Sequence, residues 1–270
     1  KLRNNQEDVA AGLKEHAAQP AETMKVLASC LFQESSASAD DLSASEALHI
    51  LGCLVKTDAN TYLKIASRAI KEEAQSRTHM SVSPEFTALL VEQLSNGTDV
   101  EAAYNASETV VACCRKMNPS FVETALAAVV QSFRQALSRL ETARAEASIS
   151  CVRCATAIVG IATIDDSSMK AAIASSGLDL LMQMLTDETD PLLQMSMLDL
   201  FENLAATQPI HHERATWIFS DDVLIPILRL AGGMEGIEPD PVLGGAALRV
   251  VAAFCKLGQR SLASSSELLP

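Results

Sequence analysis

Large aromatic side chains and chain-breaking residues are scarce in this sequence. Aromatic residues make up 4% of the 270 residues, and the chain has 11 glycines and 9 prolines. Packed helices close on small residues and need few large ones, so this is the composition of a helical protein. Strand-like alternation of apolar and polar residues is also lacking. The sequence therefore predicts an all-α fold.

Positive charge is in short supply as well. The chain carries 34 acidic and 21 Lys and Arg residues, a formal net charge of −13. Phosphate backbones would be repelled, so we expect no nucleic-acid partner and favour a protein partner with basic surface. No apolar run approaches 18 residues and no signal leader is present, so we expect no membrane partner and a cytoplasmic location, with the nucleus possible. The chain begins at Lys1 rather than Met, which fits a piece of a longer solenoid.

The seven cysteines lack the spacing of a metal or redox site. A zinc site would need a second close pair or a Cys/His cluster, which neither Cys151-x-x-Cys154 nor Cys113-Cys114 has. Their helical, apolar context favours reduced thiols that fill the core. His211-His212-Glu213 lacks further ligands too, and is interpreted as an exposed segment at a helix start. We expect no metal and no cofactor.

Catalytic motifs are missing. The sequence has no G-x-S-x-G, H-E-x-x-H or kinase-like set, and the glycines at 232, 233 and 236 are not followed by the Lys-Ser/Thr of a phosphate-binding loop. The carboxylate pairs Asp165-Asp166 and Asp221-Asp222 precede helices, where they suit amide capping and the positive end of the helix dipole. The sequence predicts that the chain is not an enzyme.

What is present is a helical repeat, clearest over residues 175–205. An apolar-periodic helix follows Gly177, the acidic turn TDETDP comes next, and a second helix carries Leu200, Phe201 and Leu204. Two such helices cannot bury both apolar stripes alone and need copies beside them. The sequence LSNGTDVEAAYNASETVVACC aligns 91 residues earlier, pairing Asp99 with Asp190.

Further copies align with the same template. Asp240 pairs with Asp190 at an offset of 50, and Asp40 pairs with it at an offset of 150. An intervening unit over Leu137–Ala162 aligns least well. We therefore predict a right-handed α-solenoid of about five degenerate armadillo/HEAT-like repeats of about 45–50 residues. We expect residues 1–270 to form a single solenoid, with a frayed tail at 261–270.

A helical wheel separates the packed side of each second helix from its polar side. Stacked second helices line one surface of a solenoid, so their polar sides would form a continuous ladder. The alternative, that these are ordinary solvated helix faces, stays open. The ladder residues are predicted to bind protein, and they are Glu46, His49, Tyr104, Asn105, Glu108, Ser196, Asp199, Glu202, Asn203 and Arg249.

The signature repeat resembles an armadillo repeat. The similarity lies in the glycine before the second helix, the acidic turn and the ending LFENLA at Leu200–Ala205. More widely, residues 171–257 resemble the 26S proteasome non-ATPase regulatory subunit 5 family. The shared features are the DPLLQ-type turn, His211-His212 before an apolar segment, and SDDVLIPILRLAGG followed by a second Asp-Pro helix.

That resemblance implies a non-catalytic assembly chaperone of the proteasome base. Its partner would be a proteasomal ATPase subunit, held through the C-terminal domain of that subunit. A second hypothesis is an armadillo-like cargo or transport adaptor that binds a peptide in its groove. Importin-type proteins fit less well, because the position of Asn203 is occupied by Ala112 and Ala253 in two aligned units.

Overall fold

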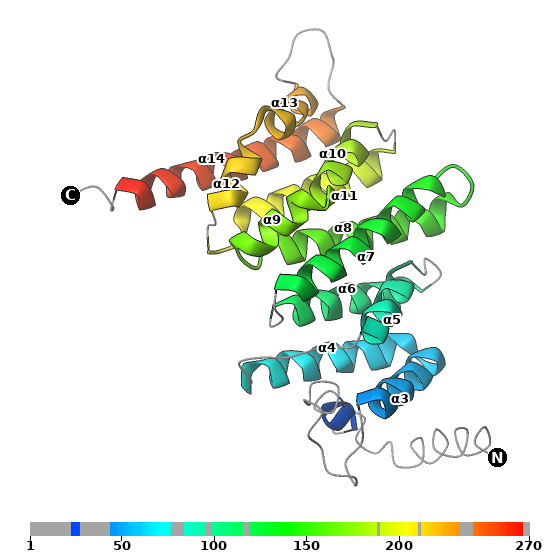
Figure 1. The fold of residues 1–270 in the computed structure, drawn as a ribbon. Coiled ribbons are helices and arrows are strands. Elements are labelled where there is room, and N and C mark those ends of the chain that lie inside the picture. Colours follow the sequence, from blue (N-terminus) through cyan, green and yellow to red (C-terminus); the bar gives the residue numbers. More distant parts are fainter. Residues whose placement is uncertain are drawn as a thin grey trace, which may run out of the picture. The chain divides into compact units, whose positions relative to one another are not determined.

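The structure of the protein is a computed structural model of residues 1–270. It describes residues 23–27, 44–76, 84–95, 99–115, 119–187, 190–209, 212–232 and 240–266. Every regular element in these ranges is a helix (Figure 1), so the predicted all-α class is confirmed. The chain divides into two compact units, residues 1–153 and residues 154–270.

The first unit is built from antiparallel helix pairs in two layers. α3 packs on α4 and α5 on α6, while α5 also contacts α3 and α7. α4 lies along α6 in the other layer (Figure 1). The helices are α3 (Ala44–Thr57), α4 (Ala59–Ser76), α5 (Pro84–Ser95), α6 (Val100–Cys114), α7 (Pro119–Ser138) and α8 (Arg144–Ala162), within which the unit ends.

The second unit repeats a group of three helices. α9 contacts α12, and α11 lies along α14 (Figure 1), so corresponding helices of the two groups pack on each other. Three helices per repeat is the armadillo arrangement, whereas the pairs of the first unit are HEAT-like. The helices are α9 (Asp166–Ala174), α10 (Gly177–Asp187), α11 (Pro191–Ala206), α12 (His212–Ile218), α13 (Asp221–Leu230) and α14 (Pro241–Ser266).

Apolar stripes of neighbouring helices form the core of each unit. In the first unit Phe86, Leu90 and Phe133 are fully buried between layers. In the second, Phe201 of α11 stacks on Trp217 of α12 with ring centroids 6.0 Å apart, and Leu204 is buried beside it. The apolar residues predicted to hold the signature repeat together are thus confirmed as core.

Aspartates begin three helices, as their alignment predicted. The Asp99 side chain accepts from the amide of Ala102 at 2.8 Å, and that of Asp190 accepts from Leu192 at 2.9 Å. Asp240 accepts from Val242 at 2.8 Å. Each carboxylate satisfies an amide that has no partner within the helix. α6, α11 and α14 are each the last helix of a repeat, and the last helix is called the second helix throughout. All three therefore start at the same point of their repeats.

The first repeat has a different register from the predicted one. The Asp40 alignment makes α3 the second helix of its repeat, but α3 contacts α4 and α5 while α4 lies along α6. α3 is therefore a first helix, and Asp40 itself lies outside the described residues. At the other end, α14 continues to Ser266, into the stretch expected to fray. The single solenoid and its hand stay predictions.

Candidate protein-binding surface

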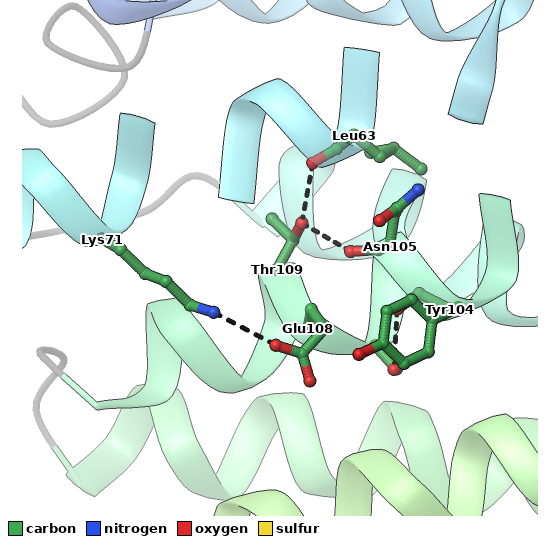
Figure 2. A network of polar contacts seen from close by, with 7 residues as sticks. Leu63, Lys71, Tyr104, Asn105, Glu108 and Thr109 are labelled. Atoms are coloured by element: carbon green, nitrogen blue, oxygen red, sulfur yellow. Dashed lines mark hydrogen bonds and ion pairs between the residues drawn. The ribbon is translucent and has the colours of Figure 1, made fainter. Parts of the chain in front are cut away.

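In the first unit, α4 and α6 are joined across the polar side of α6 by an ion pair. Nζ of Lys71 on α4 lies 3.1 Å from Oε2 of Glu108 on α6 (Figure 2). Both side chains are more than a third exposed, so solvent screens the pair and it contributes little to stability. Its effect on the surface is to neutralise the ladder carboxylate of Glu108.

Tyr104 lies one helical turn before Glu108 and shares its face of α6 (Figure 2). Tyr104 is 43% exposed, although most of its neighbours on α6 are buried. The guanidinium of Arg153 on α8 lies over this ring, with Cζ 5.1 Å from the ring centroid. That distance is within the range of a cation–π contact.

Asn105 is not on the surface, which corrects the predicted ladder. It is 5% exposed, and its Nδ2 donates to Oδ1 of Asn60 at 2.7 Å and to the Asn60 carbonyl at 3.1 Å. Beside it, Oγ1 of Thr109 lies 2.7 Å from the carbonyl of Asn105 and 3.3 Å from that of Leu63 (Figure 2). These buried polar contacts fix the register of α6 against α4, which is the reason that Asn105 points inward.

In the second unit, α11 and α14 are joined by a comparable cluster of charges. Nη2 of Arg249 lies 3.2 Å from Oδ1 of Asp199, and its Nε lies 3.4 Å from Oε2 of Glu202. The structure therefore brings together three of the predicted ladder residues. Asn203 is exposed beside them, and Ser196 is half-buried and donates to the Leu192 carbonyl at 2.9 Å.

Glu46 and His49 come from a different layer of helices than Tyr104 and Glu108. Both lie on α3, in the layer of first helices that also contains α5 and α7. The misplaced register of the first repeat is the cause: the helix that lies beside α6 is α4. The alignment that placed α3 beside α6 is therefore wrong, and a binding role for Glu46 and His49 stays a prediction.

Sequence reasoning missed the partners that the ladder residues meet. Lys71, Arg153 and Asn60 all come from the helix one repeat away, 37 to 49 residues along the chain from Glu108, Tyr104 and Asn105. A search for opposite charges, or for a cation and an aromatic residue, at the spacing of one repeat could have found the first two. The buried amide pair gives no such signal.

Most cysteines are core thiols, as predicted. Cys113, Cys114, Cys151 and Cys154 are buried and form no disulfide, and burial raises the pKa of the Cys114 thiol to about 12. Cys255 is exposed on α14, which contradicts a core role for that residue. Within the described ranges no group of three or more His, Cys, Asp or Glu residues could hold a metal ion.

The segment before α12 contains a buried arginine that the sequence does not reveal. α12 starts at His212, as expected for a helix start, and the next turn carries Arg214, which is 0% exposed. Its Nη2 donates to the carbonyls of Thr207 at 2.7 Å and Pro209 at 2.6 Å. Burial lowers its pKa, and the nearby Asp166 carboxylate opposes that shift. Arg214 therefore ties down the chain between α11 and α12.

The carboxylate pairs act at helix starts in two different ways. Asp165 caps α9 by accepting from the amide of Ser168 at 2.7 Å. Asp221 and Asp222 lie in the first turn of α13, whose N-cap is Ser220. There they face the positive end of the helix dipole without capping an amide.

Among the residues that the structure describes, two helices are long and apolar enough to cross a membrane by length and composition alone. They are α8 and residues 241–259 of α14, and 56% of the α8 window is buried inside the protein. Core helices of soluble proteins pass the same test, so the result is weak support for a membrane role.

No family model matches the chain, and no curated protein matches it. Similar solved structures include a designed armadillo repeat protein in complex with the peptide (KR)4, 15% identical, covering 88% of this chain and 100% of that one, with a TM-score of 0.42. A computationally designed armadillo repeat protein for modular peptide recognition is 17% identical, covers 86% and 91%, and has a TM-score of 0.39. An engineered protein is 18% identical, covers 94% and 97%, and has a TM-score of 0.41. These comparisons give no support to the resemblance to the proteasome subunit 5 family.

Proposed function

We propose that this chain is a protein-binding scaffold that holds a segment of its partner along its second helices. The observation that carries the proposal is the exposed Tyr104 ring, which lies with Arg153 on the side of α6 that also bears Glu108. Tyrosine and arginine are the residues most enriched at binding hot spots. Stacked second helices offer the extended surface that repeat proteins use for binding.

The ion pairs between neighbouring second helices also support a binding role. Lys71–Glu108 in the first unit and Arg249 with Asp199 and Glu202 in the second hold long side chains in place before a partner arrives. Side chains that are already ordered lose less conformational entropy on binding. The Lys71–Glu108 pair has no net charge and the Arg249 cluster has one net negative charge, so a strongly basic partner is not required.

Affinity purification with mass spectrometry tests the proposal. The tagged chain is compared with the variants Tyr104→Ala and Asp199→Lys with Glu202→Lys, after circular dichroism has shown that the fold is intact. We expect at least one variant to lose about tenfold or more of a specific partner, since hot-spot truncations cost about 2 kcal/mol or more. The matched control is Asp179→Lys with Asp187→Lys, two exposed carboxylates on α10 with the same charge change. Capture of every partner unchanged by the ladder variants would contradict the proposal.

The identity of the captured partner separates two narrower functions. Capture of a single proteasomal ATPase subunit, without mature proteasomes, would support an assembly chaperone of the proteasome base. Binding to short basic peptides that weakens steeply with salt would support a transport adaptor, because such binding is mainly electrostatic. Because each cluster of ion pairs carries at most one net charge, the clusters favour neither of them over a partner of mixed charge.

A further inference from the structure

Lys71, Arg249 and Arg153 each join neighbouring second helices, and Arg153 does so without a carboxylate. Lys71 meets Glu108, and Arg249 meets both Asp199 and Glu202. Arg153 contacts the ring of Tyr104 instead. The two residues are 49 positions apart, close to the 47 and 50 positions that separate Arg249 from Glu202 and Asp199. The partner of Arg153 is thus an aromatic ring, whereas the partners of Arg249 are acidic side chains.

The missing carboxylate is not explained by a shortage of acidic residues. The chain has 34 of them against 21 Lys and Arg residues. Yet the contact that the structure gives the Arg153 guanidinium is the Tyr104 ring, and its Nε is buried without a hydrogen-bond partner. A guanidinium carries five donors, and leaving a buried donor unpaired costs free energy. Arg153 therefore has donor capacity and charge that the described residues do not use.

The ring also orients the guanidinium. A cation–π contact holds the group over Tyr104, and the Arg153 side chain remains partly exposed to solvent. An arginine already held in place forms paired hydrogen bonds to a carboxylate with less loss of conformational entropy. Lys71 is paired with Glu108, so of the two described cations that contact side chains on this side of α6, Arg153 is the one without a carboxylate partner.

We propose that Tyr104 and Arg153 form a subsite that binds the side-chain carboxylate of a Glu or Asp in the partner segment. The carboxylate accepts from the guanidinium, and the exposed part of the Tyr104 ring contacts the apolar stem of the same side chain. The inference rests on the proposed scaffold function and adds the chemistry of the ligand: the partner carries an acidic residue at this point.

The Nε–Hε resonance of Arg153 in the ¹⁵N-labelled full chain provides a direct test. Its assignment comes from its loss in Arg153→Lys. The probes are acetylated, amidated tetraglutamate, with tetraglutamine and tetralysine of the same form as controls, and acetylated triglycine with a free carboxyl end. We expect tetraglutamate to shift the resonance to a saturating value, and added salt to reverse the shift. The other three peptides should leave the resonance in place.

Variants separate the proposed pair from a merely exposed arginine. Tyr104→Phe keeps the ring and should keep the affinity for tetraglutamate. Tyr104→Ala removes the ring that orients the guanidinium and should weaken binding about tenfold. Arg249→Met, which removes a cation that already has carboxylate partners, should change nothing at this resonance.

Three outcomes overturn the subsite. They are the absence of a tetraglutamate-dependent shift, equal affinity in Tyr104→Ala, and an equal or larger response to triglycine, which would assign the site to a chain end. Each leaves the scaffold proposal standing if the ladder variants still lose their partner in the affinity purification. Conversely, saturable binding of tetraglutamate with unchanged partner capture would overturn the scaffold function while retaining the anion subsite.

Discussion

At the scale of single residues, two asparagines of the predicted ladder have opposite environments. Asn105 is buried and donates twice to Asn60, whereas Asn203 is exposed on α11. A helical wheel places both on a polar side because it considers each helix alone. The neighbouring helix decides which polar residue is covered, and α4 covers Asn105.

Asn105→Ala should therefore lower the free energy of unfolding, whereas Asn203→Ala should not. The first change removes both hydrogen bonds to the half-buried Asn60, and a hydrogen bond of this kind contributes about 0.5–1.5 kcal/mol. The second removes an exposed side chain and should stay within about 0.5 kcal/mol of the parent. Urea unfolding followed by circular dichroism measures both. Equal effects of the two substitutions would contradict the structural assignment of Asn105.

At the scale of helices, the start of each second helix is fixed by an aspartate. Asp99, Asp190 and Asp240 accept from amides in the first turns of α6, α11 and α14. In α11 and α14 a proline follows directly, whose fixed backbone angle and missing amide hydrogen suit the first helical position. The sequence Asp-Pro thus begins a second helix in both repeats of the second unit.

Asp190→Ala should destabilise α11 and with it the second unit. Loss of an N-cap carboxylate costs about 1 kcal/mol. The matched control is Asp187→Ala, which removes an exposed carboxylate only a few residues earlier, at the end of α10, where the helix dipole does not favour a negative charge. Urea unfolding should show a lower midpoint for the first variant alone. A midpoint unchanged by Asp190→Ala would mean that packing of Leu193 and Met197 fixes the helix start instead.

These local features explain which parts of the structure the sequence could predict. The helix class, the core residues Phe201 and Leu204 and the equivalence of the capping aspartates depend on short stretches of chain, and all are confirmed. The role of α3 depends on which helix packs beside which, and no spacing within α3 carries that information. The Arg153–Tyr104 contact also depends on which helices are neighbours. It was missed because the repeat that contains Arg153 aligned least well with the template.

At the scale of the whole chain, two compact units carry separate reporters of unfolding. The single tryptophan, Trp217, lies in the second unit and stacks on Phe201. The buried thiols of Cys113 and Cys114 lie in the first unit. Burial raises the pKa of Cys114 to about 12, so its reactive thiolate forms only when that region opens.

Phe133→Leu should destabilise the first unit by about 1–2 kcal/mol, because it removes volume from a fully buried site. When the protein is titrated with urea, a thiol reagent should begin to modify Cys113 and Cys114 at a lower urea concentration than in the parent. The urea midpoint of the Trp217 fluorescence change should stay the same. Phe254→Leu, at a buried site in the second unit, should have the reverse effect. Equal shifts of both reporters would show that the chain unfolds as one cooperative body, contrary to the nearest-neighbour behaviour of repeat proteins.

The contacts between second helices also constrain how this chain can change over evolutionary time. Lys71 with Glu108 and Arg249 with Asp199 join residues 37 and 50 positions apart. A charge reversal at one member creates a like-charge contact that a reversal in the adjacent repeat relieves. Homologous sequences should therefore show paired substitutions separated by about one repeat length. Such covariation would trace the order of the repeats even where their sequences have lost visible similarity.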